Sequence, residues 1–143
     1  MGEPSPVVVL IGRRPPHEVL LLAVSIPLGL GMLTRAPAPA SVIALMPAWV
    51  VVAWATALML SGIVGVASAV WTGDILRALW AELGALLLGA GVFATYTAAV
   101  FVSAGMRAWF SGGFMGAWAV ANLIRCAQIR REVRRLTAGA RLP

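Results

Sequence analysis

The sequence predicts an all-α integral membrane protein: a bundle of four transmembrane helices with a short basic helical extension at the cytoplasmic C-terminal end. The first observation is composition, because 61% of the 143 residues are hydrophobic and only 11% are charged, whereas a soluble domain carries about 25% charged residues. The second is that the apolar residues fall into four segments separated by short turns. The third is that all 11 basic residues are arginines, gathered outside those segments or near their ends. We therefore expect one membrane domain spanning residues 1–143.

The first predicted span covers residues 16–34. Pro16 suits the first turn of a helix, and Glu18 suits the positive end of its dipole. The apolar part is only about 22 Å long as a helix, against a hydrocarbon core of about 30 Å, so snorkelling or local thinning has to close the gap. A second interpretation stays open, because two arginines, a short apolar run and the small residues at 38–41 also resemble a cleavable signal peptide.

The second predicted span, residues 46–71, is the stretch around which the bundle is organised. It carries no charged residue, and as a helix it would be about 39 Å long, which is enough to cross the bilayer. Trp49 and Trp71 stand near its ends, where tryptophan favours the membrane–water interface. Small residues at every fourth position form a ridge that lets another helix approach closely in lipid. The members of this ridge are Ala53, Ala57, Ser61, Gly65 and Ala69.

The third predicted span, residues 75–104, follows a tight turn in which Asp74 is placed to cap the helix. Beyond Glu82 the segment is uncharged. It has a small-residue ridge of its own, made by Ala81, Ala85 and Gly89. We therefore expect the second and third spans to pack along their ridges as an antiparallel hairpin.

The fourth predicted span, residues 108–126, follows a short turn at 103–107. Arg107 and Arg125 flank it, and we expect both side chains to snorkel outward. Its small face is two rows wide, which suits close helix packing and self-association into a homo-oligomer. The members of this face are Gly112, Gly113, Gly116, Ala117, Ala119 and Ala121.

The basic tail, residues 125–143, is predicted to continue the helix as far as Leu136 and to fray from Thr137 onward. Its arginines surround an apolar face of Cys126, Ile129, Val133 and Leu136. An arginine near an anionic membrane surface contributes about 1 kcal/mol of binding, so the bilayer and anionic lipid headgroups are the expected partners. Nucleic acid is not expected, because no aromatic residues interleave with the basic ones. The membrane-surface basic residues are Arg125, Arg130, Arg131, Arg134 and Arg135.

The distribution of arginines predicts the topology. Four spans place both termini and the turn at Asp74 on one side of the membrane, and that side holds nine arginines: Arg13, Arg14, Arg77, Arg125, Arg130, Arg131, Arg134, Arg135 and Arg141. The other side holds Arg35 and Arg107. Because cytoplasmic loops carry the excess of basic residues, both termini should be cytoplasmic. A three-span arrangement divides the charges less cleanly unless the first segment is cleaved.

Glu82 is the acid of greatest interest, because an ionisable residue on a membrane helix is a functional candidate by default. It lies only about 12 Å along the helix from the turn at Asp74. Arg77 or the basic tail is therefore within reach as a partner near the headgroups. Two interpretations stay open: an interfacial or structural carboxylate, and a possible intramembrane functional acid.

No catalytic or metal site is predicted. His17 and Cys126 are the only imidazole and thiol groups, and they lie at opposite ends of the sequence. No serine or cysteine is placed beside a base that would activate it. Two Gly-x-Gly pairs, beginning at Gly29 and Gly89, lie in apolar helices and predict helix packing. We expect no enzyme activity, no cofactor and no metal.

The whole chain resembles small multi-span membrane proteins of actinobacterial phages, some of which are holins. The resembling features are the arginine-bearing N-terminal region, the Pro-flanked turns, the Ala- and Gly-rich helices and the end IRCAQIRREVRRL. The absence of lysine, with abundant Ala and Gly, is also typical of high-GC bacterial and phage genomes. The resemblance implies accumulation in the bacterial inner membrane of the host, lateral self-association and timed permeabilisation that releases a wall-degrading enzyme.

Two alternatives from other classes stay open. One is a small four-helix proton-coupled transporter of the multidrug type, with Glu82 as its coupling carboxylate; that family carries its acid in the first span, where this chain has only Glu18. The other is an accessory membrane scaffold that binds partners without any activity of its own.

Overall fold

The computed structural model describes residues 16–34 and 39–139, and every regular element in these ranges is helical. In chain order they are α2 (Pro16–Thr34), α3 (Ala40–Leu45), α4 (Ala48–Ala69), α5 (Ile75–Ala104), the 3₁₀ helix η1 (Gly105–Ala108) and α6 (Trp109–Gly139). The all-α class is confirmed. Five residues used in the sequence argument lie outside the described residues: Arg13, Arg14, Arg35, Ala38 and Arg141.

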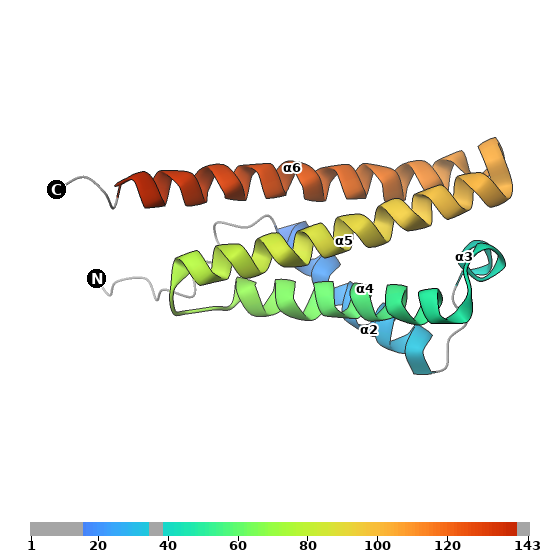
Figure 1. Ribbon diagram of the computed structural model, residues 1–143, viewed down its shortest axis with the longest axis horizontal. Coiled ribbons are helices and arrows are strands. Elements are labelled where there is room, and N and C mark those ends of the chain that lie inside the picture. The colour runs from blue at the N-terminus through green and yellow to red at the C-terminus, as the bar shows by residue number, and fades with distance from the viewer. Residues whose placement is uncertain (1–15, 35–38, 140–143) are drawn as a thin grey trace.

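Each long helix packs on the next long helix along the chain (Figure 1). Helix α4 lies between α2 and α5, and α5 packs along α6. The short helix α3 and the turn at η1 lie at one end of the bundle, whereas the α4–α5 turn and the end of α6 lie at the other. The last turns of α6 extend past the remaining helices (Figure 1).

Three helical segments of the described chain are long and apolar enough to cross a membrane: Pro16–Thr34, Ala48–Ala69 and Ile75–Ala138. The third segment contains both α5 and α6, because the helical path reverses at η1 without a long loop. Gly105 makes this reversal with a φ of 56°, a left-handed conformation that glycine adopts without a steric penalty.

Helix α2 packs on α4 through glycines that bring the two backbones together. A Cβ atom at Gly29 would lie 2.7 Å from the carbonyl oxygen of Ala55, and one at Gly62 would lie 2.5 Å from that of Leu22. Neither position therefore has room for a side chain. The prediction that Gly29 is a packing glycine is confirmed, whereas Gly62 lies one residue from Ser61 and was not part of the predicted ridge.

Helices α4 and α5 form the predicted antiparallel hairpin and are joined by buried side-chain hydrogen bonds. The Ser61 hydroxyl donates to the carbonyl oxygen of Ala85 at 2.8 Å. The indole of Trp54 donates to the carbonyl oxygen of Val92 at 3.0 Å. Burial removes these donors from water, so each bond also avoids the penalty of an unsatisfied polar group. Helix α5 begins as predicted, because the Asp74 carboxylate caps its N-terminus by accepting a hydrogen bond from the amide of Leu76 at 2.8 Å.

The N-terminal half of the predicted basic tail packs on α5. Cys126 and Ile129 are buried in one cluster with three leucines of α5, and Val133 packs against it. The leucines are Leu79, Leu83 and Leu86. The predicted apolar face of the tail is therefore real as far as Val133, while Leu136 is 47% exposed.

Several element boundaries differ from prediction, and α4 ends at Ala69, two residues before the predicted end. Residues 40–45, which lie between the first two predicted spans, form the short helix α3, whose Val42 is fully buried. Helix α4 starts at Ala48, two residues later than predicted, because Pro47 has an extended backbone. Fraying was expected from Thr137, but α6 continues to Gly139, and the Thr137 hydroxyl donates to the carbonyl oxygen of Val133 at 3.0 Å.

Candidate functional site

Arg125 on α6 is the centre of a charged network inside the bundle. Its Nε and Nη2 atoms donate to the same oxygen of Glu82 on α5, at 3.2 and 3.0 Å. The Glu82 side chain is 1% exposed and that of Arg125 is 18% exposed. A charge-assisted hydrogen bond of this kind is stronger than a neutral one, and burial strengthens it further.

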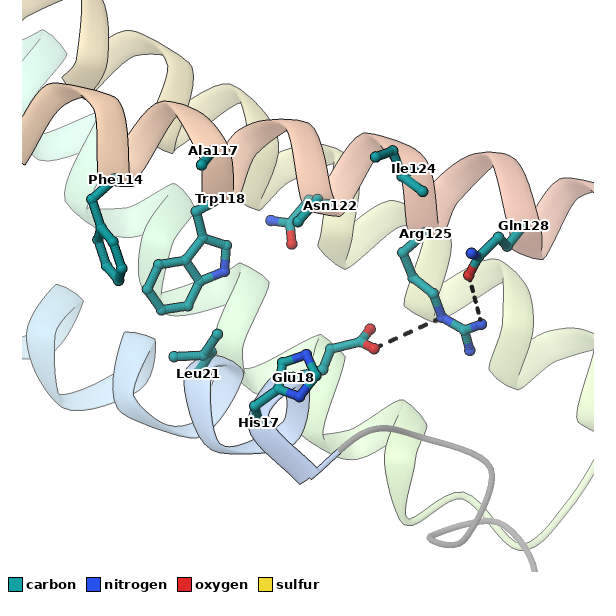
Figure 2. A pocket seen from close by; sticks show the side chains of 11 residues that line it. His17, Glu18, Leu21, Phe114, Ala117, Trp118, Asn122, Ile124, Arg125 and Gln128 are labelled. Atoms are coloured by element: carbon teal, nitrogen blue, oxygen red, sulfur yellow. Dashed lines mark hydrogen bonds and ion pairs between the residues drawn. The ribbon is translucent and has the colours of Figure 1, made fainter.

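Glu18 brings a third helix into the network. It lies in the first turn of α2, and its Oε2 atom is 3.8 Å from Nε of Arg125. Figure 2 shows the two side chains reaching toward each other across the space between α2 and α6. At the outer edge, Arg125 also meets Gln128 at 3.5 Å and Glu132 at 3.9 Å. One guanidinium therefore ties α2, α5 and α6 together.

The local sequence explains why these groups meet. Glu82 lies among the leucines that form the buried face of α5, and Arg125 immediately precedes Cys126 on the buried face of α6. The same packing that buries Cys126 and Ile129 places Arg125 level with Glu82. Arg77 is engaged elsewhere, with its Nε 3.6 Å from Asp74.

The structure changes the expected role of Arg125. We predicted a surface residue that snorkels outward, whereas it turns into the bundle. The pairing of Glu82 with the first arginine of the tail is as expected. A signal in the sequence points to this network. The charges placed furthest into the apolar segments are Glu18, Glu82 and Arg125, and opposite charges within a membrane pair with one another.

A groove of about 540 Å³ opens between α2 and α6. Phe114 and Trp118 of α6 line one end of it, and His17, Glu18 and Arg125 lie at the other. In Figure 2 the side chains of Phe114, Trp118 and Arg125 point from α6 toward α2. The groove thus grades from aromatic to charged along its length.

Asn122 stands in the middle of this groove and was not singled out from the sequence. It is 8% exposed, and its amide forms no hydrogen bond with any described residue. Behind it lies a small chamber of about 20 Å³, which Ser25 and Ser61 also line. A volume of this size holds about one water molecule.

The predicted small-residue positions divide into an inner and an outer set. Buried in the single chain are Ser61, Gly65, Ala69, Ala85, Gly89, Gly112 and Ala119. Partly buried are Ala57, Ala81 and Gly116. Exposed are Ala53, Gly113, Ala117 and Ala121. The inner set makes contacts within the bundle, and the outer set lies on its surface.

The remaining tail arginines are exposed. They are Arg130, Arg131, Arg134 and Arg135, on the stretch of α6 that leads out of the bundle. Within the ranges that the structure describes, no group of three or more His, Cys, Asp and Glu side chains is arranged to hold a metal ion.

Comparison with known proteins adds no assignment: no family model, no curated protein and no solved structure matches this chain.

Proposed function

We propose that this chain is a non-enzymatic integral membrane protein with four spans and both termini in the cytoplasm. Length and apolarity support it, since α2, α4 and the two arms of the Ile75–Ala138 segment run back and forth along one bundle. Charge supports the orientation. Among the described arginines, Arg107 lies at the η1 end, whereas Arg77, Arg125 and those of the tail lie toward the opposite end. The proposed location is the inner membrane of a bacterium, or of the bacterial host of a phage.

We further propose that its activity is holin-like: copies associate side by side and permeabilise the membrane. The observation that carries this proposal is a set of helical glycines with open space beside them. A Cβ at Gly84, Gly91 or Gly113 would meet nothing within 4 Å. Glycine inside a helix is destabilising by about 0.5–1 kcal/mol relative to alanine, and a close helix contact offsets this cost. Gly29 and Gly62 have such a contact within the chain, so a second copy is the expected neighbour of the other three.

The two glycine-bearing faces differ from each other, which favours extended assembly. Gly84 and Gly91 are seven residues apart on α5 and so share one helix face. On α6, Gly113 shares a face with the exposed residues Ala117 and Ala121. Contact between the α5 face of one copy and the α6 face of the next is heterologous, and heterologous contacts repeat into rings or open arrays. The exposed tail arginines would meanwhile bind anionic headgroups on the cytoplasmic side.

The transporter alternative receives less support from the geometry. It requires Glu82 to exchange a proton with a substrate. Glu82 is 1% exposed, hydrogen-bonded to Arg125, and not among the residues that line the groove. A carboxylate held in this way positions α5 against α6. Because a glutamine oxygen can still accept from Arg125, Glu82→Gln should leave the permeabilising activity intact.

The test is inducible expression in bacteria, with and without a cytoplasmic endolysin. The wild-type chain should cause abrupt loss of membrane potential, and lysis only when the endolysin is present. Gly84→Leu and Gly113→Leu should delay or abolish lysis, because each places a bulky side chain on a contact face. Ala67→Leu is the matched control, since Ala67 is an exposed small residue of α4 outside both faces. Equal lysis timing in all four strains would contradict the proposal, and so would the absence of lysis with the wild-type chain.

A further inference from the structure

A second concave site, the α5–α6 cleft, has a volume of about 290 Å³. Helices α5 and α6 lie side by side along its length (Figure 1). None of its lining residues belongs to the groove between α2 and α6. Its apolar wall is made by Leu87 of α5 with Leu123 and Ala127 of α6, and its basic wall by Arg130, Arg131 and Arg134 of α6.

The cleft changes from apolar to basic in one direction along α6. Leu123, Ala127, Arg130 and Arg134 follow one face of the helix, with the spacing i, i+4, i+7 and i+11. This face is about 16 Å long. In the proposed topology its apolar end lies in the hydrocarbon and its basic end lies among the cytoplasmic headgroups. Leu87 and Leu123 are 39% and 51% exposed, so the apolar end is open to lipid at the side of the bundle.

The three arginines of the cleft carry positive charge that the described chain does not neutralise. All three are exposed, and none forms a hydrogen bond or ion pair with a described residue. The acid nearest to them in the sequence, Glu132, lies on the other side of α6, 3.9 Å from Arg125. Arg130 and Arg134 stand four residues apart, where like charges destabilise a helix. An anion bound between them removes this repulsion.

We propose that the α5–α6 cleft binds one anionic phospholipid of the cytoplasmic leaflet. The phosphate lies between Arg130 and Arg134, because guanidinium groups donate paired hydrogen bonds to phosphate oxygens. One acyl chain runs along Leu123 into the bilayer. Basic pockets between membrane helices on the cytoplasmic side bind anionic headgroups in this way. The inference rests on the proposed membrane topology and does not depend on the permeabilising activity.

Two features distinguish this site from simpler binding of an anion. The apolar wall favours a lipid over a free phosphate ion, which has no apolar part to cover Leu87 and Leu123. A defined cleft also differs from diffuse attraction to a charged surface, because diffuse attraction depends on the number of arginines and not on which way they face. Arg135 provides the comparison, since it directly follows Arg134, is exposed and does not line the cleft.

The experiment is native mass spectrometry of the full chain released from detergent micelles, which gives the dissociation constant of the first bound lipid. Phosphatidylglycerol, an anion, and phosphatidylcholine, a zwitterion, are titrated separately with the same acyl chains. Wild type should bind phosphatidylglycerol at least about tenfold more tightly. Arg134→Gln should weaken that binding about fivefold or more, and Arg135→Gln should weaken it less than about twofold.

A second pair of variants tests the shape of the cleft without changing any charge. Ala127→Trp places an indole against the apolar wall and should weaken phosphatidylglycerol binding about as much as Arg134→Gln does. Ala67→Trp is the matched control, because Ala67 is an exposed residue of α4 outside the cleft, and it should bind as wild type does. Inorganic phosphate in molar excess should leave the lipid bound.

Three results would overturn the proposal: equal affinities for the two lipids, equal weakening by Arg134→Gln and Arg135→Gln, or displacement of the lipid by inorganic phosphate. Unchanged binding by Ala127→Trp would also overturn it, because the lipid would then lie on the tail and not in the cleft. Gly113→Leu separates this inference from the proposed self-association, since Gly113 lies outside the cleft. It should lose self-association and keep the preference for phosphatidylglycerol. An error in the proposed topology would appear in reporter fusions instead, because binding in micelles does not depend on orientation.

Discussion

Arg125 donates two hydrogen bonds to one oxygen of Glu82, at 3.2 and 3.0 Å, and so joins α6 to α5 across 43 residues of sequence. The acceptor is almost fully buried, at 1% exposure. Because the pair lies in a low-dielectric environment, each charge depends on the other for its stability there. The pair also fixes which face of α6 is turned toward α5.

The first prediction concerns this pair. Arg125→Met should lower the free energy of unfolding by about 3–5 kcal/mol, because it removes the guanidinium that the buried carboxylate faces. Glu82→Gln should have a smaller effect, since an amide oxygen still accepts from Arg125. The double variant Arg125→Met/Glu82→Leu should recover most of the loss, because an apolar pair needs no desolvation. Denaturant titration in detergent measures all three, and an unchanged Arg125→Met protein would contradict the network.

The second prediction compares two glycine-to-alanine changes. Gly62→Ala should destabilise the bundle by about 1–3 kcal/mol, because the new methyl group would lie 2.5 Å from the Leu22 carbonyl oxygen and force α2 away from α4. Gly91→Ala has open space and should be neutral or stabilising by up to about 1 kcal/mol. Thermal unfolding in dilute detergent distinguishes them. Equal effects would show that α2 does not pack on α4 at Gly62.

The third prediction concerns topology. Reporter fusions after Gly139 and within the turn at 72–74 should report the cytoplasm, and a fusion within residues 35–38 should report the opposite side. The excess of arginines at the end of α6 supplies the physical reason. An epitope tag at Met1 should stay on the protein, whereas its loss would identify the first segment as a cleaved signal peptide. A periplasmic signal from the Gly139 fusion would be incompatible with four spans.

The fourth prediction concerns the contact between copies. In a Cys126→Ala background, chains carrying Gly91→Cys and chains carrying Ala121→Cys should cross-link to each other when expressed together, because these two positions lie at about the same depth on the two faces. Each alone should cross-link much less, because the contact joins two different faces. The unsubstituted chain, whose Cys126 is 4% exposed, is a separate control and should not cross-link. Cross-links of Gly91→Cys with itself would indicate a two-fold symmetric dimer instead of an extended array.

Much of the fold follows from local chemistry. Helix α5 has the predicted limits, because Asp74 caps its start and the uncharged run ends near a glycine that the turn requires at Gly105. Helix α3 was missed because its six residues follow a proline-rich stretch that favours extended backbone. The hairpin of α4 and α5 was predictable, since both helices carry small residues where they meet.

The candidate site was harder to predict because it depends on how helices are rotated about their axes. Spacing alone put Arg125 on the polar face of the tail, and only the packing of Cys126 and Ile129 on α5 turns it inward. Gly62 was overlooked for a similar reason. The four-residue ridge through Gly65 identified a small face, and Gly65 does lie against the Leu22 side chain, but the closest backbone approach is at Gly62. The groove joins residues about a hundred positions apart, and no local pattern predicts such a meeting.

The α6 wall of the groove has a consequence for control. Ala117 and Ala121 line the groove and also belong to the exposed small face proposed to meet a second copy. A molecule seated in the groove and a neighbouring chain would therefore compete for the same surface. By thermodynamic linkage the competition is reciprocal. The factor by which a bound molecule lowers the association constant of two copies equals the factor by which association lowers the affinity for that molecule. Any occupant of the groove would thereby raise the number of copies at which assembly begins.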